Sequence, residues 1–205
     1  MDILTALPLA FVMIAGPQII SSFFFATSSD WKRISAAFVF GALISVTIVV
    51  TVGYLLGKGI GTREEDDGGL TGVDYAVLAL LVAAAIYTFH TRTNEEPPKW
   101  MGKLQGATPK RALVLGWLML GLFPTDVFTS LSVGARLGDR DDPWLDALPF
   151  VALVVLFLAS PALSVALLGE RAERWMPKIR DWMNANSWIV SEIVLVFFVV
   201  IILTG

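Results

Sequence analysis

The chain has 205 residues, a formal net charge of −3, one histidine and no cysteine, so disulfides, thiolate metal sites and dithiol relays are excluded. Hydrophobic residues make up 56% of the sequence and the mean hydropathy is +0.71, which indicates an integral membrane protein. Because the sequence contains no catalytic constellation, metal-ligand spacing, phosphate-binding loop or basic run, we expect no enzyme, cofactor, metal or nucleic-acid partner.

Six apolar stretches are long enough to cross a bilayer, since about 20 apolar residues span its hydrocarbon core. They lie at approximately 3–26, 34–57, 71–91, 111–134, 146–168 and 187–204. The predicted fold is therefore an all-α integral membrane protein with a first three-helix repeat (1–91), a cytoplasmic linker (92–110) and a second three-helix repeat (111–205). Because each half has an odd number of spans, the second repeat is predicted to be inverted relative to the first.

The first span contains a proline near its middle, in Gly16-Pro17-Gln18. Proline lacks a backbone donor and clashes with the preceding turn, so we expect the helix to break there and to line a cavity. Gln18 offers a donor and an acceptor to a substrate, or it bonds the backbone freed by Pro17. Ser21, one turn later, either extends this polar surface or bonds its own backbone or a neighbouring helix.

The second span contains Gly53 and Gly57, a pair of small residues that lets two helix backbones approach closely. This pattern favours packing within the chain over dimerisation. A homodimer is the alternative. The Leu55-Leu56-Gly57 segment at the end of this span recurs as Leu167-Leu168-Gly169 at the end of the fifth span, which is compatible with an internal repeat.

The fourth span contains the second central proline, in Phe123-Pro124-Thr125-Asp126. A carboxylate two residues beyond this break is costly in hydrocarbon, so Asp126 is expected to face the protein interior or water, where it would bind a cation or carry a proton. Alternatively, Thr125 and Asp126 cap the amides of the following half-helix and complement its dipole. The two roles are compatible.

Three features are predicted after the fourth span. Ser160-Pro161 is predicted to interrupt the fifth span. Residues 170–186 carry tryptophan, methionine and isoleucine at helical spacing between basic residues, which predicts an amphipathic helix in the membrane interface. It would act as a topological anchor, or as a lateral gate or lipid-sensing element. Glu192 in the last span either reaches the interface or is a second buried acid that takes part in coupling.

The distribution of basic residues predicts the orientation in the membrane. The first, third and fifth loops carry eleven lysines and arginines, and the second and fourth carry four. The positive-inside rule then places both termini outside a multi-pass protein of the cytoplasmic (plasma) membrane.

The paired proline breaks and the segment Gly169-Glu170-Arg171-Ala172-Glu173-Arg174-Trp175, followed by Ile179-Arg180-Asp181-Trp182, resemble a known family. The chain is similar to the lysine exporter superfamily, and most similar to its peptidoglycolipid- and sulfolipid-addressing branch. The resemblance covers nearly the whole chain and implies a six-helix exporter whose cargo is a lipid or amphiphilic conjugate.

We therefore expect a transporter whose partners are membrane lipids and a small-molecule or lipid substrate, with its path between the two broken helices. The expected path residues are Gly16, Pro17, Gln18, Ser21, Pro124, Thr125 and Asp126, and the candidate coupling residues are Asp126 and Glu192. An amino-acid or small-cation exporter is the alternative. A non-transporting module that organises lipids or a partner complex is the alternative from another class.

Overall fold

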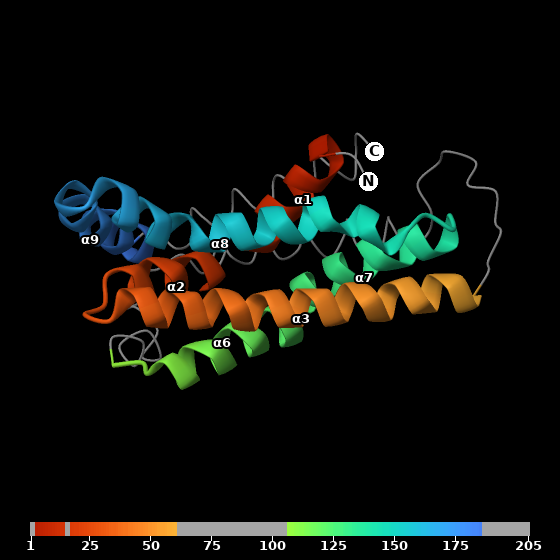
Figure 1. Cartoon of the computed structure of the whole chain (residues 1–205), viewed down its shortest axis with the longest axis horizontal. Helices are drawn as coiled ribbons and strands as arrows, with labels where there is room; N and C mark the ends of the chain where they lie inside the picture. The colour runs from red at the N-terminus through yellow and green to blue at the C-terminus, as the bar shows by residue number, and fades with distance from the viewer. Residues whose placement is uncertain (1–2, 15–16, 61–105, 186–205) are drawn as a thin grey trace, which may run out of the picture.

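The computed structural model describes residues 3–14, 17–60 and 106–185, and every regular element in this part of the chain is helical (Figure 1). In chain order the elements are α1 (Ile3–Ile14), α2 (Pro17–Ala26), α3 (Trp31–Ile60), α6 (Pro109–Leu122), α7 (Pro124–Asp139), the 3₁₀ helix η1 (Trp144–Ala147), α8 (Leu148–Leu168) and α9 (Glu170–Ala185). The predicted spans 71–91 and 187–204, most of the linker, Gly16 and Glu192 lie outside the described residues.

Two helical stretches in the described residues are long and apolar enough to cross a membrane, Trp31–Gly59 and Trp144–Leu168. A third span is present if α6 and α7 are counted together, with a bend of 67° between them. The prediction of an all-helical membrane protein is confirmed for this part of the chain.

Both predicted proline breaks are present. α1 ends at Ile14 and α2 begins at Pro17, while α6 ends at Leu122 and α7 begins at Pro124. A proline in the first turn of a helix costs no hydrogen bond, because its missing N–H would have had no partner within the helix. Phe123, at the junction, has the extended backbone that a residue before proline favours (φ −67°, ψ 124°).

The interruption predicted at Ser160-Pro161 is wrong, because α8 continues through Pro161 to Leu168. Pro161 has no N–H to donate to the carbonyl of Phe157 four residues earlier. The Ser160 hydroxyl donates to that carbonyl instead, at 2.7 Å, so the helix keeps a donor at this point. Pro177 likewise lies inside α9, whose observed range Glu170–Ala185 agrees with the predicted helix over 170–186.

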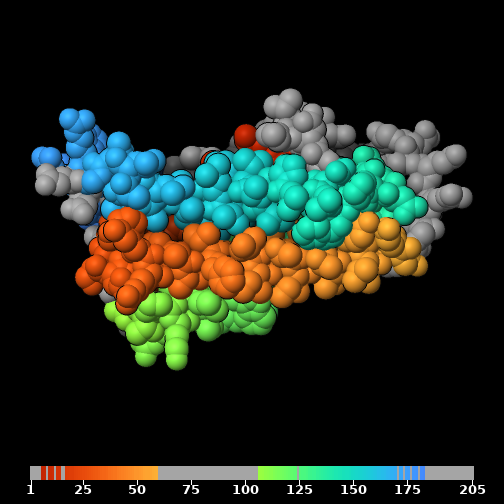
Figure 2. Space-filling model, in the orientation of Figure 1, coloured from red at the N-terminus to blue at the C-terminus, as the bar shows by residue number. Residues whose placement is uncertain are grey.

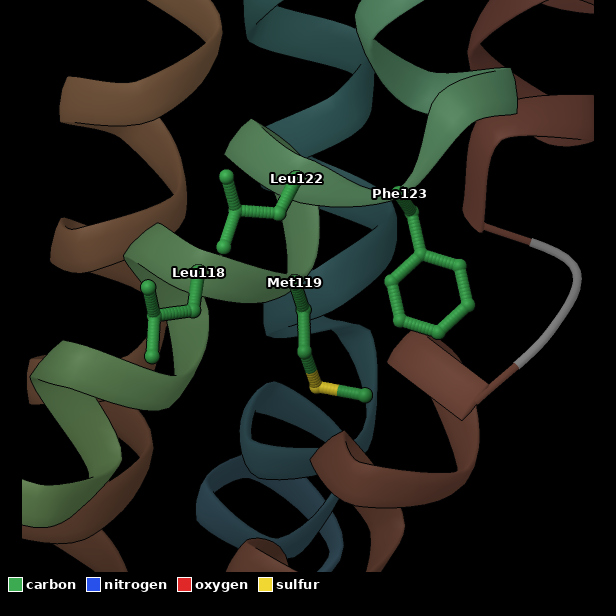
Figure 3. Close-up of a pocket in the computed structure, with 4 residues that line it drawn as sticks. All are labelled: Leu118, Met119, Leu122 and Phe123. Atoms are coloured by element: carbon green, nitrogen blue, oxygen red, sulfur yellow. The ribbon is translucent and has the colours of Figure 1, made fainter.

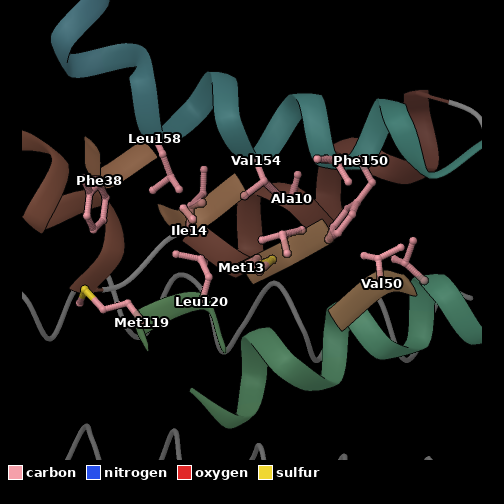
Figure 4. Close-up of a cluster of buried hydrophobic side chains, with 14 of the residues drawn as sticks. Ala10, Met13, Ile14, Phe38, Val50, Met119, Leu120, Phe150, Val154 and Leu158 are labelled. Carbon is pink, nitrogen blue, oxygen red and sulfur yellow. The ribbon is translucent and has the colours of Figure 1, made fainter. Parts of the chain in front are cut away.

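Each long helix packs along the broken helix of the other half. α3 lies along α6 and α7, and α8 lies along α1 and α2 (Figure 1). On the face drawn in Figure 2, α3 lies between α6 and α8. Apolar side chains from these elements form the larger of two clusters of buried side chains in the described residues, and Figure 4 shows part of it, with Phe150, Val154 and Leu158 of α8. Its fully buried members include Ala10, Phe38, Val50, Leu120, Phe150 and Val154.

The contact between α3 and α6–α7 is made by glycines, and we call the set Gly41, Gly53, Gly57, Gly116, Gly134 and Gly138 the glycine seam. A Cβ built on Gly134 would lie 2.0 Å from the carbonyl oxygen of Val50, and one built on Gly53 would lie 2.3 Å from that of Leu131. Backbone therefore touches backbone along the seam, as small residues in membrane helices allow. The prediction that Gly53 and Gly57 pack within the chain is confirmed.

Candidate functional site

The two proline breaks meet through a buried hydrogen bond. The Gln18 side chain donates from Nε2 to Oδ2 of Asp126 at 2.5 Å. Gln18 follows Pro17 in the first turn of α2, and Asp126 lies two residues after Pro124 in the first turn of α7. The two residues are only 2% and 1% exposed. Because a helix begins at each proline, the Gln18 amide meets the Asp126 carboxyl group, although the two residues are 108 positions apart in the sequence.

The Asp126 side chain has a second donor, since Thr125 Oγ1 lies 3.3 Å from its Oδ1. The capping alternative is not what these hydrogen bonds show: the N-cap residue of α7 is Phe123, and it makes no side-chain cap bond. An acid in the first turn is still favoured by the positive end of the helix dipole. The hydrogen bonds of the carboxyl group thus go to the first half of the chain and to its own neighbour.

The Gln18 amide uses only one of its two polar atoms in this contact. Its Nε2 is bonded to Asp126, but its Oε1 is buried and has no hydrogen-bond partner within the described residues. The predicted alternative for Gln18, a bond to the backbone freed by Pro17, is not what is seen, because its side chain donates to Asp126 instead. Ser21 bonds its own helix, donating to the Pro17 carbonyl at 2.8 Å. A buried acceptor without a donor is costly. Among the described residues, Oε1 is therefore the atom that calls for a ligand where the two breaks meet, a place that we call the crossing.

Two serine–methionine contacts flank the central pair in a reciprocal pattern. Ser21 of α2 donates to the sulfur of Met119 on α6 at 3.6 Å. Ser130 of α7 donates to the sulfur of Met13 on α1 at 3.7 Å. In each case the serine follows one break and the methionine precedes the other, and the four side chains are buried.

A pocket opens beside the second break, at the end of α6 (Figure 3). Leu118, Met119, Leu122 and Phe123 line it, and its volume is about 300 Å³, which is at the lower end for sites that hold small molecules. Its wall is apolar throughout. Met119 connects this pocket to the serine–methionine contacts, because its side chain lines the pocket and its sulfur accepts a hydrogen bond from the Ser21 hydroxyl.

The structure brings together most of the predicted path residues: Pro17, Gln18 and Ser21 at one break, and Pro124, Thr125 and Asp126 at the other. Gly16 and Glu192 lie outside the described residues. Sequence reasoning missed Met13, Met119, Ser130 and the pocket. Their distance from the prolines was the available signal, since each methionine lies about one turn before a proline and Ser130 lies less than two turns after one.

The model of the family described as "Sap, sulfolipid-1-addressing protein" matches residues 6–205. No curated protein and no solved structure matches the chain.

Proposed function

The chain belongs to the sulfolipid-1-addressing protein family, and on that basis we propose that it exports a lipid or amphiphilic conjugate across the cytoplasmic membrane. The substrate path runs between the broken helices, where Gln18 meets Asp126. The observation that carries this proposal is the buried hydrogen bond between these two side chains, one from each half of the chain.

A buried polar pair of this kind is costly for a protein that only needs to hold helices together. An ionisable side chain within a membrane segment usually faces a pathway or a partner, because hydrocarbon does not solvate it. At the six glycines of the glycine seam, α3 packs against α6–α7 through backbone atoms. Function is therefore a better reason for Asp126 than stability, and this argues against a module that merely organises lipids.

The contacts also support the inverted repeat that we propose for the whole chain. Exchanging the two halves converts the Ser21–Met119 contact into the Ser130–Met13 contact and returns the Gln18–Asp126 pair to itself. The same exchange converts the packing of α3 on α6–α7 into the packing of α8 on α1–α2. In transporters built from inverted repeats the substrate site lies near the midplane at the repeat interface, where this pair would lie.

Two features favour an amphiphilic cargo over an amino acid or a small cation. The family description names a sulfolipid, and an apolar pocket lies beside the polar crossing. An amino-acid or small-cation path has no need for an apolar pocket beside its polar groups. We propose further that Asp126 couples export to proton movement, with Glu192 as a second candidate for coupling.

Transport by purified protein in liposomes tests this function. A fluorescent short-chain lipid is placed in both leaflets, and its movement is followed by the fraction that a membrane-impermeant reductant quenches. The native chain should move the lipid faster than empty liposomes, and an imposed pH gradient should accelerate the movement. Asp126→Asn should remove the acceleration by the pH gradient, because a side-chain amide neither gains nor loses a proton between acid and neutral pH.

The matched control is Asp139→Asn, which removes an exposed acid at the far end of the same helix. This variant should transport like the native chain. A native chain that moves no lipid would overturn the exporter proposal and favour the lipid-organising module. Transport whose pH dependence survives Asp126→Asn would remove the coupling role and leave export standing.

A further inference from the structure

One buried acceptor at the meeting of the two breaks has no donor within the described residues. Gln18 donates a hydrogen bond from Nε2 to Asp126, and its Oε1 is buried without a partner within the described residues. Asp126 in turn receives hydrogen bonds from Gln18 and Thr125. A ligand that satisfies this site must therefore bring a hydrogen-bond donor.

The chemistry at the crossing separates three kinds of polar group. An anionic group such as a sulfate has only acceptor oxygens. Beside Oε1, which is also an acceptor, its oxygens would be repelled and could form no hydrogen bond. An ammonium brings donors, but it must lose its hydration shell in a buried site whose carboxyl group already has two donors. A hydroxyl brings one donor at a much smaller desolvation cost.

The pocket beside Met119 supplies the second half of the ligand. Its lining is apolar and its volume is about 300 Å³, enough for a slender apolar group but small for a whole lipid. Since Met119 both lines this pocket and contacts Ser21, one turn beyond Gln18, the apolar site lies next to the polar crossing. A ligand that fills both must join a hydroxylated group to a hydrocarbon chain.

We propose that the substrate binds with an uncharged hydroxyl at Gln18 Oε1 and a single alkyl chain in the pocket lined by Leu118, Met119, Leu122 and Phe123. This inference rests on the proposed export function and names the substrate class. An anionic group elsewhere on the same substrate lies away from the Gln18–Asp126 pair.

Photo-crosslinking in phosphatidylcholine nanodiscs tests the inference without requiring transport. Three probes carry the same diazirine-bearing alkyl chain on different head groups: a glucoside, a sulfate and a primary ammonium. The glucoside should label the 118–123 segment about fivefold more than the sulfate, a preference that one buried hydrogen bond supplies. Equal labelling by all three probes, or preferred labelling by the ammonium, would overturn the inference.

Two pairs of variants assign the two halves of the ligand. Gln18→Met keeps the length of the side chain and removes its acceptor, so the preference for the glucoside should disappear. Since this change leaves Asp126 short of a donor, the double variant Gln18→Met with Asp126→Leu keeps the test valid if the single variant does not fold. A glucoside preference that persists in the folded double variant contradicts the role of Gln18.

The chain site is tested by Leu118→Trp, which fills the pocket and should abolish labelling by every probe. Val114→Trp is the control, because Val114 is exposed one turn earlier on the same helix and does not line the pocket. If Leu118→Trp labels like the control, the pocket does not hold the chain. Specific labelling by a protein that moves no lipid would leave this binding site standing and refute export alone.

Discussion

The two long helices of the described chain, α3 and α8, each lie along a broken helix, but they use different surfaces to do so. α3 meets α6 and α7 at the glycine seam, where a single added Cβ would fall within 2.0–2.3 Å of a backbone oxygen. α8 meets α1 through side chains, with Phe150, Val154 and Leu158 facing Ala10 and Ile14 (Figure 4).

This difference bears on which part of the molecule adjusts. A backbone contact has no rotamer to change, so any shift along the glycine seam would separate the two helices outright. Side chains at the α8 interface can repack around a small displacement. If the path between the broken helices opens and closes, we expect α8 and α1–α2 to adjust while α3 and α6–α7 move as one unit.

The largest expected effect is that of Gly134→Ala. The new Cβ would lie 2.0 Å from the Val50 oxygen and 2.7 Å from the Tyr54 nitrogen, and neither backbone atom can move aside without moving α3. We expect a loss of about 3 kcal/mol or more in the free energy of unfolding, at the upper end for overpacking. The measurement is a reversible unfolding titration of the detergent-solubilised protein, followed by circular dichroism.

A loss below about 1 kcal/mol in Gly134→Ala would mean that α3 and α7 separate easily, which removes the contrast with α8. Gly138→Ala provides a second reading, because its Cβ would meet the Tyr54 oxygen at 2.2 Å one turn further along the same helix. Both substitutions should destabilise the chain if the seam is continuous.

An intermediate effect is expected for Leu158→Met at the α8 interface. Leu158 is 1% exposed, so the site is as buried as the seam, but its neighbours are side chains that can change rotamer. A swap that conserves volume in such a core costs less than about 1.5 kcal/mol. The same titration measures it, and a cost equal to that of Gly134→Ala would show that α8 is as rigidly fitted as α3.

Much of the fold follows from local sequence rules. Pro17 and Pro124 predicted both helix breaks, because proline is excluded from a helix interior unless something replaces its missing donor. Pro161 shows where this rule stops: Ser160 replaces the donor at Phe157, and α8 continues. A proline preceded by serine is therefore a weaker sign of a break than one preceded by glycine or phenylalanine.

The sequence predicted which residues form the candidate site, but not which of them bond to each other. Gln18 and Asp126 stood out because polar groups beside a break in an apolar stretch are costly. That Gln18 would bond Asp126 and leave Oε1 without a partner depends on where the first turns of α2 and α7 lie relative to each other, which is a matter of tertiary packing. Met13, Met119 and the pocket were missed for a related reason, since methionine in an apolar helix is ordinarily read as core.

The smallest expected effect comes from Gly59→Ala, and it has the opposite sign. Gly59 lies two residues beyond Gly57 on α3, but in the described part of the chain no atom lies within 4 Å of a Cβ placed there, whereas at Gly57 the Ala135 oxygen lies 2.2 Å away. Replacing an uncrowded helical glycine by alanine stabilises a protein by about 0.5–1 kcal/mol, because the unfolded chain loses freedom and the helix gains propensity. Gly57→Ala should destabilise in the same titration. If Gly57→Ala stabilises the chain as Gly59→Ala does, glycine at these positions reflects helix propensity alone and the backbone contact of the seam contributes nothing.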